Sequence, residues 1–549
     1  MMKRSQILFI GLVCIQWAVS SSQAGSIHPD LLLTLKDMSP EEEISVIVTL
    51  SDQENLSQFT DKDKKVRRSK INRALRDKAG KTQKSLREFL RKNKVAKVTP
   101  LWIVNGMAVT LRADQVAELA RRTDVQSLSL DAILSLPLPS PALSGVPEWN
   151  LEAINAPALW ALGYTGTGVV VASMDTGVDA AHPDLAPRWR GGSNSWFDPN
   201  GEYSTPYDTS GHGTQTMGVM VGGDAGGSAI GVAPDARWIA VKLFNNDGFT
   251  SYSAIHQGFQ WLLDPDGDPD TDDLPDVVNN SWGFDGAVDQ CFEELEFRPD
   301  IQALKSAGVA VVFSAGNAGP NPSTSVSLAN YPESFAVGSV DELLQVTSTS
   351  SRGPSACDGT IFPELVSPGV TIRTADLTSA GTYLDSYAFV SGTSIAGPHI
   401  AGAMALLISV NPELTVAELE TVLMQSATDL GDFGADNVYG YGLLNLAASY
   451  DLFTTYSLNV NVSGGGDSSV VSDPHGISCP VDCQGEYVEG RLVTLTAVPA
   501  SNSRFAGWSG DCTGMELLCQ VTMNQVKNVS ASFYSFPWSL FVPIKSKQP

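Results

Sequence analysis

The spacing of apolar residues divides the chain into three regions with different structural signatures. Up to residue 133, short alternating strands are interleaved with one long stretch of helical spacing, residues 64–92. From residue 149 to about 450, buried apolar runs alternate with helical segments. That alternation predicts a parallel sheet covered by helices on both faces. Beyond residue 452, short strands and turns predict a small all-β domain.

In the first region the predicted elements follow the order β-α-β-β-α-β, which is typical of a split βαβ, ferredoxin-like sandwich. Asn105-Gly106 is a strong two-residue hairpin signal between two of its strands. The predicted strands are residues 44–50, 101–104, 107–111 and 125–130, and the predicted helices are residues 64–92 and 113–122.

In the middle region the predicted strands are short and strongly apolar, so we expect them in the centre of the sheet. In such sheets the functional residues lie at the carboxyl ends of the strands. The predicted strands are residues 169–174, 239–243, 277–278, 309–313 and 335–340, with helices at residues 252–263 and 300–307.

The first 24 residues have the pattern of a signal peptide. Lys3 and Arg4 precede an apolar run, and Ser22-Gln23-Ala24 is a small-residue cleavage site. The run is too short to span a bilayer, and we expect no later stretch to be long enough. The sequence therefore predicts a secreted, extracellular protein, with the periplasm as the alternative.

Charge is distributed unevenly along the 549 residues, whose net charge is −25. Residues 25–133 carry 20 Lys and Arg against 15 Asp and Glu, a net charge of +5. With the two basic residues of the signal set aside, the rest holds 13 basic and 45 acidic residues. We expect the basic front segment and the acidic body to attract each other. The acidic body argues against nucleic acid as a partner.

The seven cysteines fit an exported protein. Cys14 lies in the signal, and the other six can pair in an oxidising compartment. A zinc site made of the four C-terminal cysteines is the less favoured alternative. The expected disulfides are Cys479–Cys483, Cys512–Cys519 and, by parity alone, Cys291–Cys357.

Three residues in the middle region carry the groups of a nucleophilic active site. Asp175 follows a predicted strand, where a carboxylate can hold a histidine in one tautomer. His212 stands between glycines at a predicted helix start, and Ser394 opens an apolar helix, where N–H groups and the helix dipole favour developing negative charge. Each has a simpler reading alone: a turn residue, a core histidine, a helix cap. Pro398 is expected in or near the first turn of the helix, where proline is tolerated.

Asn317 follows another predicted strand, where its amide can donate to an oxyanion. The order Asp, His, Asn, Ser and the motifs Asp175-Thr176-Gly177, Gly211-His212-Gly213-Thr214 and Gly392-Thr393-Ser394-x-Ala396-x-Pro398 resemble the signatures of the subtilases. The likeness covers nearly all of residues 149–450 and is greatest to the bacillopeptidase F-like branch. His182, His256 and His399 are expected to be structural.

The resemblance implies a secreted serine endopeptidase that hydrolyses peptide bonds through an acyl-enzyme, made as an autoprocessed zymogen. It assigns Asp175, His212, Ser394 and Asn317 to catalysis. It places Ser281, Trp282, Gly283, Ala315 and Gly316 along the substrate cleft, and an indole at Trp282 is expected to narrow or flatten the pocket.

The resemblance also bears on cofactors and partners. No cofactor is expected to be required for catalysis. An acidic run that continues to Asp272 and Asp273 could bind structural calcium, with a solvated acidic loop as the alternative. Its candidate ligands are Asp264, Asp266, Asp268 and Asp270. The partners are protein or peptide substrates and the chain's own propeptide as inhibitor. The competing hypothesis is an inactive subtilase-fold protein used for binding or adhesion.

The C-terminal region resembles the B-repeat-like domains of bacterial surface and secreted proteins, through Val493-Thr494-Leu495-Thr496-Ala497 and Phe505-Ala506-Gly507-Trp508 set among its cysteines. A surface or polymer ligand is the partner that this implies. The predicted fold is thus a three-layer α/β subtilisin-like domain with a parallel sheet, after a ferredoxin-like propeptide and before a small all-β domain. The expected boundaries are 1–24 for the signal, 25–133 for the propeptide, 134–148 for an exposed, Pro-rich linker with the processing site, 149–452 for the peptidase domain, 453–535 for the β domain and 536–549 for the tail.

Overall fold

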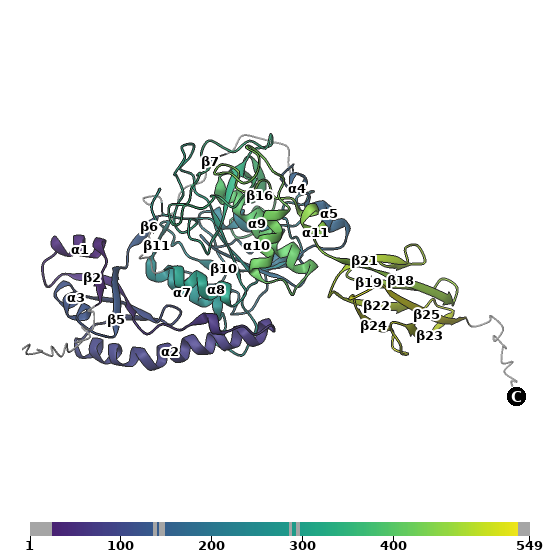
Figure 1. The fold of residues 1–549 in the computed structure, drawn as a ribbon, viewed down its shortest axis with the longest axis horizontal. Coiled ribbons are helices and arrows are strands. Elements are labelled where there is room, and N and C mark those ends of the chain that lie inside the picture. The colour runs from purple at the N-terminus through teal and green to yellow at the C-terminus, as the bar shows by residue number, and fades with distance from the viewer. Residues whose placement is uncertain (1–24, 136–139, 142–148, 285–287, 292–296, 536–549) are drawn as a thin grey trace, which may run out of the picture. The chain divides into compact units, whose positions relative to one another are not determined.

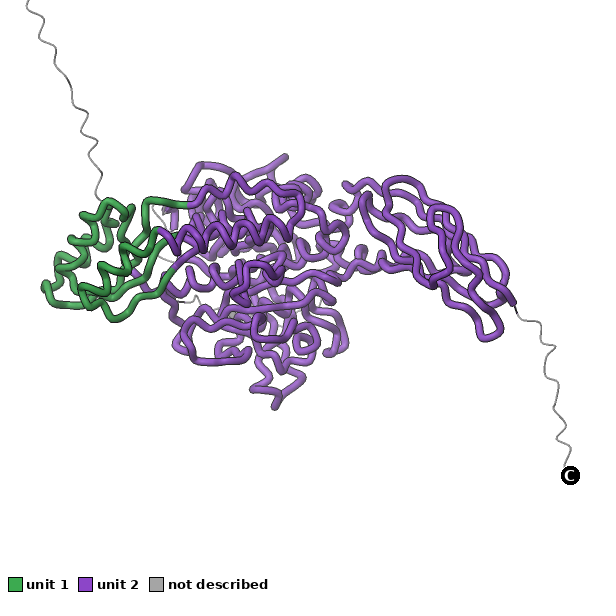
Figure 2. The backbone as a smooth tube through the Cα atoms, turned by 90° about the horizontal axis from the view of Figure 1, so that it is seen from below, with its two compact units in different colours: residues 1–53, 82–100, 105–130 green, residues 54–81, 101–104, 131–549 purple. Residues whose placement is uncertain are grey.

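The computed structural model describes residues 25–135, 140–141, 149–284, 288–291 and 297–535. The expected signal, most of the expected linker and the expected tail lie outside the described residues. The chain forms two compact units (Figure 2). The smaller holds residues up to 53, 82–100 and 105–130, and the larger holds residues 54–81, 101–104 and all residues from 131 onward.

The smaller unit is built on a five-stranded sheet with the order β1-β5-β2-β4-β3. The order β5-β2-β4-β3 is the one expected for a split βαβ sandwich, and β1 adds to it in parallel beside β5. Leu86, Val116 and Leu119 are among the helix residues that pack on this sheet. Its elements are β1 (Ser26–Ile27), α1 (Pro29–Lys36), β2 (Glu43–Leu50), α2 (Lys64–Lys92), β3 (Lys97–Leu101), β4 (Gly106–Arg112), α3 (Ala113–Ala120) and β5 (Val125–Leu130).

The hairpin between β3 and β4 differs from the sequence prediction. β3 ends at Leu101, where the predicted strand begins, and residues 102–105 form a turn. The backbone N–H groups of Trp102 and Ile103 donate to Gln260 Oε1, at 2.7 and 3.4 Å. The two N–H groups therefore bond to a side chain far along the sequence instead of pairing across the hairpin. A local hairpin signal carries no information about such a distant partner.

The larger unit contains a seven-stranded, all-parallel sheet with the order β15-β14-β13-β12-β8-β10-β9 (Figure 1). This confirms the predicted subtilisin-like fold class. Besides its long helices and the C-terminal β domain, the larger unit contains the strands of this sheet, several strands outside it and two short 3-10 helices. They are η1 (Leu56–Gln58), β6 (Ile133–Ser135), β7 (Ser140–Pro141), β8 (Val170–Asp175), η2 (Ala186–Arg188), β9 (Trp196–Phe197), β10 (Arg237–Lys242), β11 (Phe249–Ser251), β12 (Val277–Asn280), β13 (Ala310–Ser314), β14 (Phe335–Val340), β15 (Leu365–Pro368), β16 (Ile372–Ala375) and β17 (Tyr387–Ser391).

Helices cover both faces of this sheet. Val171 of β8 belongs to the core formed with Met217 and Ile400, on α6 and α9. Met174, three residues along the same strand, faces the other way, because a Cβ added at Gly258 of α7 would lie 2.7 Å from its methyl carbon. The helices are α4 (Trp149–Ala153), α5 (Ala156–Ala161), α6 (His212–Val221), α7 (Tyr252–Leu263), α8 (Arg298–Ser306), α9 (Thr393–Val410), α10 (Val416–Gln425) and α11 (Leu446–Asp451).

Helix α9 is apolar along its whole length, and by length and composition it is long enough to cross a membrane. The sequence prediction that no stretch after the signal is long enough therefore missed this helix. Within the fold 94% of it is buried, so its hydrophobicity is that of a core helix.

The C-terminal domain is a sandwich of two four-stranded sheets, with the orders β21-β18-β25-β23 and β20-β19-β22-β24. Leu458, Val493, Trp508 and Phe533 contribute to the core between them. This confirms the predicted all-β domain. The strands are β18 (Thr455–Gly464), β19 (Ser469–Asp473), β20 (Ser478–Cys479), β21 (Gln484–Val488), β22 (Leu492–Val498), β23 (Ser503–Gly510), β24 (Leu518–Thr522) and β25 (Lys527–Ser535).

All three expected disulfides are present, including the pair inferred from parity alone. Cys291–Cys357 closes a long loop of the larger unit. Cys479–Cys483 and Cys512–Cys519 close short loops of the β domain. The cysteines of the β domain are thus paired as disulfides, and the alternative of a zinc site is wrong.

Candidate active site

Asp175 is the last residue of β8, a strand with neighbours on both sides in the sheet. Its backbone carbonyl accepts from the N–H groups of Leu243 and Phe244, at 2.7 and 3.2 Å. The Thr176 N–H donates to Asp175 Oδ1 at 2.7 Å. The carboxylate is therefore held at the carboxyl end of the sheet, and the side chain is buried.

His212 is the first residue of α6 and lies directly beside Asp175. Its Nδ1 is 2.7 and 3.0 Å from the two Asp175 carboxylate oxygens, and both side chains are 1% exposed. Because ionised carboxylate oxygens only accept, Nδ1 carries the proton and Nε2 keeps a free lone pair. The close approach requires glycine at position 213, where a Cβ would lie 2.1 Å from Gly177 O.

The electrostatic environment of His212 is dominated by two carboxylates. Burial alone lowers the pKa of His212, but the charge and hydrogen bond of Asp175, and the charge of Asp208, outweigh it and raise the pKa above its ordinary value. Asp208 accepts from the N–H groups of Ser210 and Gly211, at 2.9 and 3.0 Å, and from both the N–H and the hydroxyl of Thr214. It therefore ties the chain before His212 to the first turn of α6.

Ser394 is the second residue of α9, and its side chain is 9% exposed. Its hydroxyl donates to Ser281 O at 3.3 Å. Pro398 lies inside α9, just past its first turn, and offers no N–H to Ser394 O. Ser281 Oγ donates to that carbonyl at 2.7 Å instead. The segment 281–283 is thereby fixed against the first turn of α9.

Asn317 follows β13 and is oriented by Thr393, the residue before Ser394. Its Oδ1 accepts from the Thr393 N–H at 3.1 Å and from the Thr393 hydroxyl at 3.0 Å. Since a backbone N–H can only donate, the amide oxygen must face Thr393. The Nδ2 group is then directed away from Thr393.

Ser394, Asn317 and the segment 281–283 line one pocket of about 240 Å³. The Val326 side chain lies close to both Gly316 and Gly283. A Cβ added at Gly316 would lie 2.6 Å from one of its methyl groups, and a Cβ added at Gly283 would lie 3.1 Å from the other. No charged side chain of the described residues lines it. Its lining residues are Ser281, Trp282, Gly283, Val288, Ser314, Gly316, Asn317, Ala318, Val326, Ala329 and Ser394.

Comparison with known proteins places this geometry in a family. Residues 166–442 match the model of the subtilase family, and residues 458–536 match that of the divergent InlB B-repeat domain. The chain belongs to the subtilase family. Its enzyme class is accordingly that of the serine-type endopeptidases.

Individual relatives agree with this assignment. Bacillopeptidase F of Bacillus subtilis (strain 168) is 35% identical over 453 residues, which cover 75% of this chain and 31% of that protein. Subtilisin E of the same strain is 34% identical over 349 residues, covering 63% of this chain and 81% of the relative. Subtilisin of Bacillus pumilus is 35% identical over 304 residues, covering 55% and 98%. The chain thus spans about a third of bacillopeptidase F and most of the subtilisins.

Two of the expected cleft residues lie differently from the sequence interpretation. The Trp282 indole is 2% exposed, donates to Met174 O at 2.8 Å and packs edge-on against Phe244 and Phe313. The indole is thus anchored in the core, while Trp282 remains one of the residues that line the pocket. Ala315 is fully buried and donates its N–H to Val337 O, so it extends the sheet and supports its neighbour Gly316.

The histidines set aside from the sequence make structural contacts in this subtilase. His399 Nδ1–H donates to Ile395 O at 2.9 Å, Nε2 faces Asn150 Nδ2 at 2.9 Å, and burial lowers its pKa to about 4. His182 contacts Ser386 O and the Asp184 N–H. His256 is paired with Asp300 at 2.9 Å.

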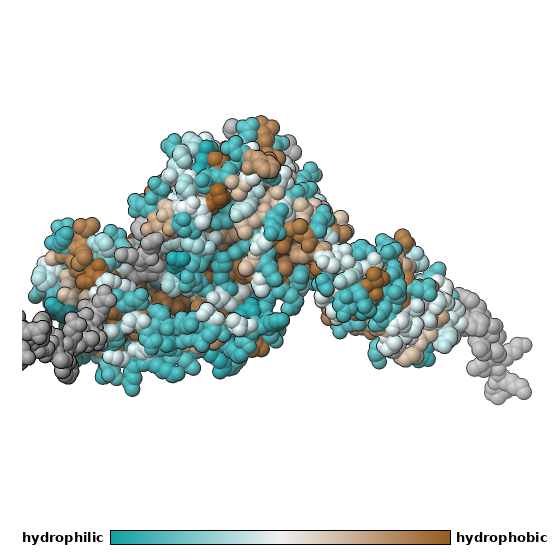
Figure 3. All heavy atoms as spheres, in the orientation of Figure 1, coloured by the Kyte–Doolittle hydropathy of each residue, from teal (hydrophilic) through white to brown (hydrophobic). Residues whose placement is uncertain are grey.

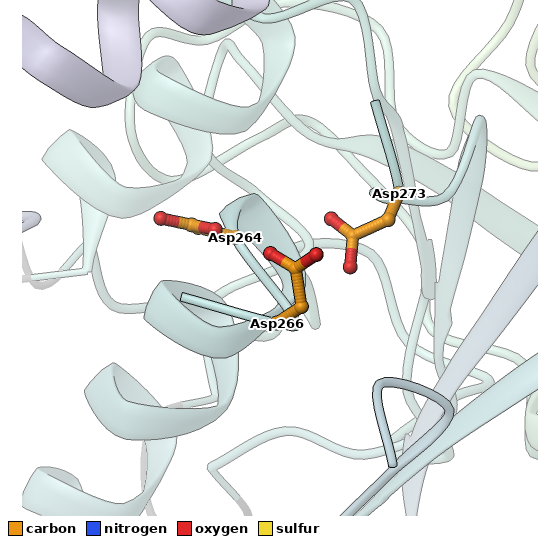
Figure 4. A group of neighbouring side chains, drawn as sticks. All are labelled: Asp264, Asp266 and Asp273. Atoms are coloured by element: carbon orange, nitrogen blue, oxygen red, sulfur yellow. The ribbon is translucent and has the colours of Figure 1, made fainter. Parts of the chain in front are cut away.

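The acidic loop differs in detail from the sequence interpretation. Carboxylate oxygens of Asp264, Asp266 and Asp273 lie within 4.8 Å of one another (Figure 4). Asp270 instead bonds Arg73 and Ser69, and Asp268 is not part of the group. The structure therefore brings Asp273, rather than Asp268 or Asp270, beside the first two aspartates.

Sequence reasoning missed three residues that shape this site. Asp208 stands four residues before His212, a spacing that could have been noticed. Thr393 orients Asn317, and its place beside Ser394 was also visible. Val326 is separated from every motif, and no signal in a single sequence indicates that it lines the pocket.

Proposed function

We propose that this subtilase hydrolyses peptide bonds in proteins, with Asp175, His212 and Ser394 as its triad and an acyl-enzyme as intermediate. The observation that carries the proposal is the buried Asp175–His212 pair, which leaves His212 Nε2 unprotonated at the carboxyl end of the sheet. His212 Nε2 takes the proton of Ser394, whose oxygen attacks the scissile carbonyl. His212 then gives that proton to the leaving amine, and water repeats the sequence to release the acid.

The negative charge that develops on the carbonyl oxygen needs donors fixed in advance. The Asn317 Nδ2 group and the Ser394 N–H are the donors we assign. Asn317 is suited to the role because Thr393 holds its amide in one orientation. Ser394 lies in the first turn of α9, where backbone N–H groups are free and the helix dipole favours the anion.

We assign substrate binding to backbone pairing along an exposed edge, together with one side-chain pocket. β6 pairs antiparallel with β11, with Leu134 opposite Thr250, and this pairing supports the proposal that an extended chain can add to this edge. Ser281, Gly283 and Gly316 line the pocket, Trp282 supports it from the core, and Ala315 supports Gly316. The uncharged lining favours an apolar side chain beside the scissile bond.

We further propose that residues 25 to about 133 are an inhibitory propeptide that the enzyme removes itself. β6 follows this segment and lies on β11, and β7 pairs with Val390 and Ser391 of β17, just before Ser394. The chain is therefore held on both sides of the stretch between residues 135 and 140. We expect cleavage in the linker, between about Leu130 and Glu148, and most narrowly between β6 and β7.

Two experiments test the proposal. Purified protein should cleave a fluorogenic peptide with an apolar residue at the scissile position, and a serine-directed inhibitor should abolish that cleavage. A folded protein with no such activity would favour the alternative, an inactive subtilase-fold binding protein.

The second experiment follows processing by gel and N-terminal sequencing in a host that lacks extracellular proteases. Ser394→Ala should accumulate as an uncut, signal-free precursor, while Asn317→Ala should process slowly. Maturation of Ser394→Ala at the normal site and rate would contradict self-processing.

Catalysis by subtilisins needs no cofactor, and we propose the same here. Structural calcium is proposed at Asp264, Asp266 and Asp273, whose hard oxygen atoms converge. We also propose that the predicted signal peptide directs export of the protein. The β domain, which matches the B-repeat model, is proposed to attach the protein to a surface or polymer.

A further inference from the structure

The loop between α7 and β12, residues 264–276, places an unusual density of carboxylates beside a basic helix. Figure 4 shows the carboxylates of Asp266 and Asp273 facing each other, with Asp264 next to Asp266. Oxygens of these three lie within 4.8 Å of one another, close enough for one hard cation to contact all three. On the peptidase side, Arg190 donates to Asp273 O and interacts electrostatically with Asp273 and Asp266.

Asp264 differs from the others because it is buried, with its side chain 1% exposed. Its Oδ2 accepts from Arg76 of α2, while its Oδ1 is buried and makes no hydrogen bond to the described residues. A buried carboxylate needs a compensating cation or hydrogen-bond donors for its oxygen atoms. In this structure that cation is Arg76, and one oxygen still lacks a donor.

Arg76 is one of a row of arginines along α2 that covers the loop. Arg68 bonds Asp272 at 2.8 Å and Asp276 at 3.3 Å, and Arg73 bonds Asp270 at 3.0 Å. All of these contacts lie within the larger unit, to which residues 54–81 belong. Figure 3 shows a hydrophilic margin where Figure 1 places α2, as expected for so basic a helix.

Donors from α2 also cover the helix ends next to the loop. Asn72 Nδ2 donates to Leu263 O at the end of α7, and Arg68 Nε donates to Ala307 O at the end of α8. Carbonyl groups at helix ends have no partner in their own helix. If α2 leaves, Asp264 loses its counter-charge and the carbonyl groups of Leu263 and Ala307 lose their donors together.

We propose that loop 264–276 is a cation-exchange site, at which Arg76 of α2 and a calcium ion are alternative partners of the Asp264–Asp266–Asp273 group. Calcium takes this group when α2 departs, and calcium binding weakens the hold of the loop on α2. The two effects are one coupling free energy, so each partner must lower the affinity of the other by the same factor. The proposal rests on the proposed function, in which α2 is part of a propeptide that leaves.

The first test measures calcium binding in the full-length Ser394→Ala chain, which keeps α2 whether or not the enzyme processes itself. Titration calorimetry with CaCl2 should show at least tenfold tighter binding when Arg76→Gln is added. Adding Arg73→Gln is the matched control, because its partner Asp270 lies outside the converging group, and it should change the affinity less than threefold. Equal affinity with and without Arg76→Gln overturns the proposal.

The Asp266→Asn substitution tests the location of the site, since Asp266 is exposed and accepts hydrogen bonds from the Asp268 N–H and the Thr271 hydroxyl, within the loop itself. In the Ser394→Ala/Arg76→Gln chain it should reduce calcium affinity at least tenfold. Binding that persists unchanged in this variant overturns the assignment to the loop. These measurements need no peptidase activity, so a failure of the proposed function would leave them interpretable.

The reciprocal test follows release of the cleaved N-terminal segment from wild-type protein by gel filtration. Release should be several-fold faster in CaCl2 than in MgCl2 of equal ionic strength, because Mg²⁺ gives up its bound water reluctantly and is rarely held by protein carboxylates alone. Asp266→Asn should remove the difference. If the N-terminal segment is released equally fast in the two salts, the salts act only by screening charges, and the proposed exchange between Arg76 and calcium is overturned.

Discussion

At the scale of single residues, the amide of Asn317 is the group whose direction is most completely fixed. Its oxygen is held by two donors from Thr393, so only its nitrogen is free to meet a substrate oxygen. The sequence suggested an oxyanion donor from a motif, and the structure supplies the physical reason why the donor points one way.

For Asn317→Ala we expect kcat to fall by about 10²–10³-fold with little change in KM, because the lost bond forms only in the transition state. The Asn317→Asp variant keeps an acceptor for Thr393 but has no donor for the oxyanion, so its kcat should fall by at least as large a factor. Steady-state kinetics on one peptide measures both. A change confined to KM would contradict an oxyanion role.

For Asp208→Asn we expect the acidic limb of the kcat/KM profile to move to lower pH. The Asp208 charge raises the pKa of His212, so its removal lets the pKa fall, and the neutral base persists at lower pH. Asp235→Asn, on a surface loop, is a control that should leave the limb in place. A shift to higher pH would show that Asp208 does not act through its charge.

At the scale of elements, the first turn of α9 depends on a bond from outside the helix. Pro398 leaves Ser394 O without its usual donor, and Ser281 Oγ replaces it. A proline inside a helix is ordinarily unfavourable. Here the carbonyl that lacks a helical donor accepts from Ser281, and this bond connects α9 to the segment 281–283 that borders the pocket.

In the Ser394→Ala chain, Ser281→Ala should lower the free energy of unfolding by about 1–3 kcal/mol, because a buried acceptor loses its donor. Pro398→Ala restores an N–H at the right position in the helix, so Ser281→Ala should cost less in that background. Urea unfolding of the four chains gives the coupling directly. Additive effects would mean that the two groups do not share this carbonyl.

At the scale of the whole molecule, the peptidase domain carries the residues assigned to catalysis, and the β domain carries none of them. The groups assigned to catalysis all lie between residues 175 and 394, while the β domain contributes contacts such as Arg491 Nη1 to Ser409 O at 2.8 Å. Those contacts support the fold rather than the site.

A chain ending after Asp451 should therefore cleave small peptides within about twofold of the full-length rate and unfold at a lower temperature, because it loses these contacts. Retention on cell-wall or polysaccharide preparations should fall at the same time. Peptide kinetics, thermal unfolding and a pull-down measure the three. Loss of peptide cleavage in a folded truncation would place a catalytic contribution in the β domain.

The sequence alone determined the elements that depend on local patterning. The helix at residues 64–92 and the strand at residues 335–340 have the predicted bounds, because apolar spacing reflects which face a backbone buries. The motifs around Asp175, His212, Asn317 and Ser394 were readable because a tight turn or a free helix end demands particular residues within a few positions. Cysteine parity fixed even the pairing of Cys291 with Cys357.

Only the tertiary structure decided what depends on contacts between distant residues. The Trp282 indole lies in the core because it donates to Met174 O and packs against two phenylalanines. Val326, which belongs to a loop without a motif, lines the pocket close to Gly316 and Gly283. Likewise Asp273, and not Asp268 or Asp270, joins Asp264 and Asp266, because the loop folds back on itself. Side-chain direction and close approach are set by packing across the whole chain, and a linear pattern carries no record of them.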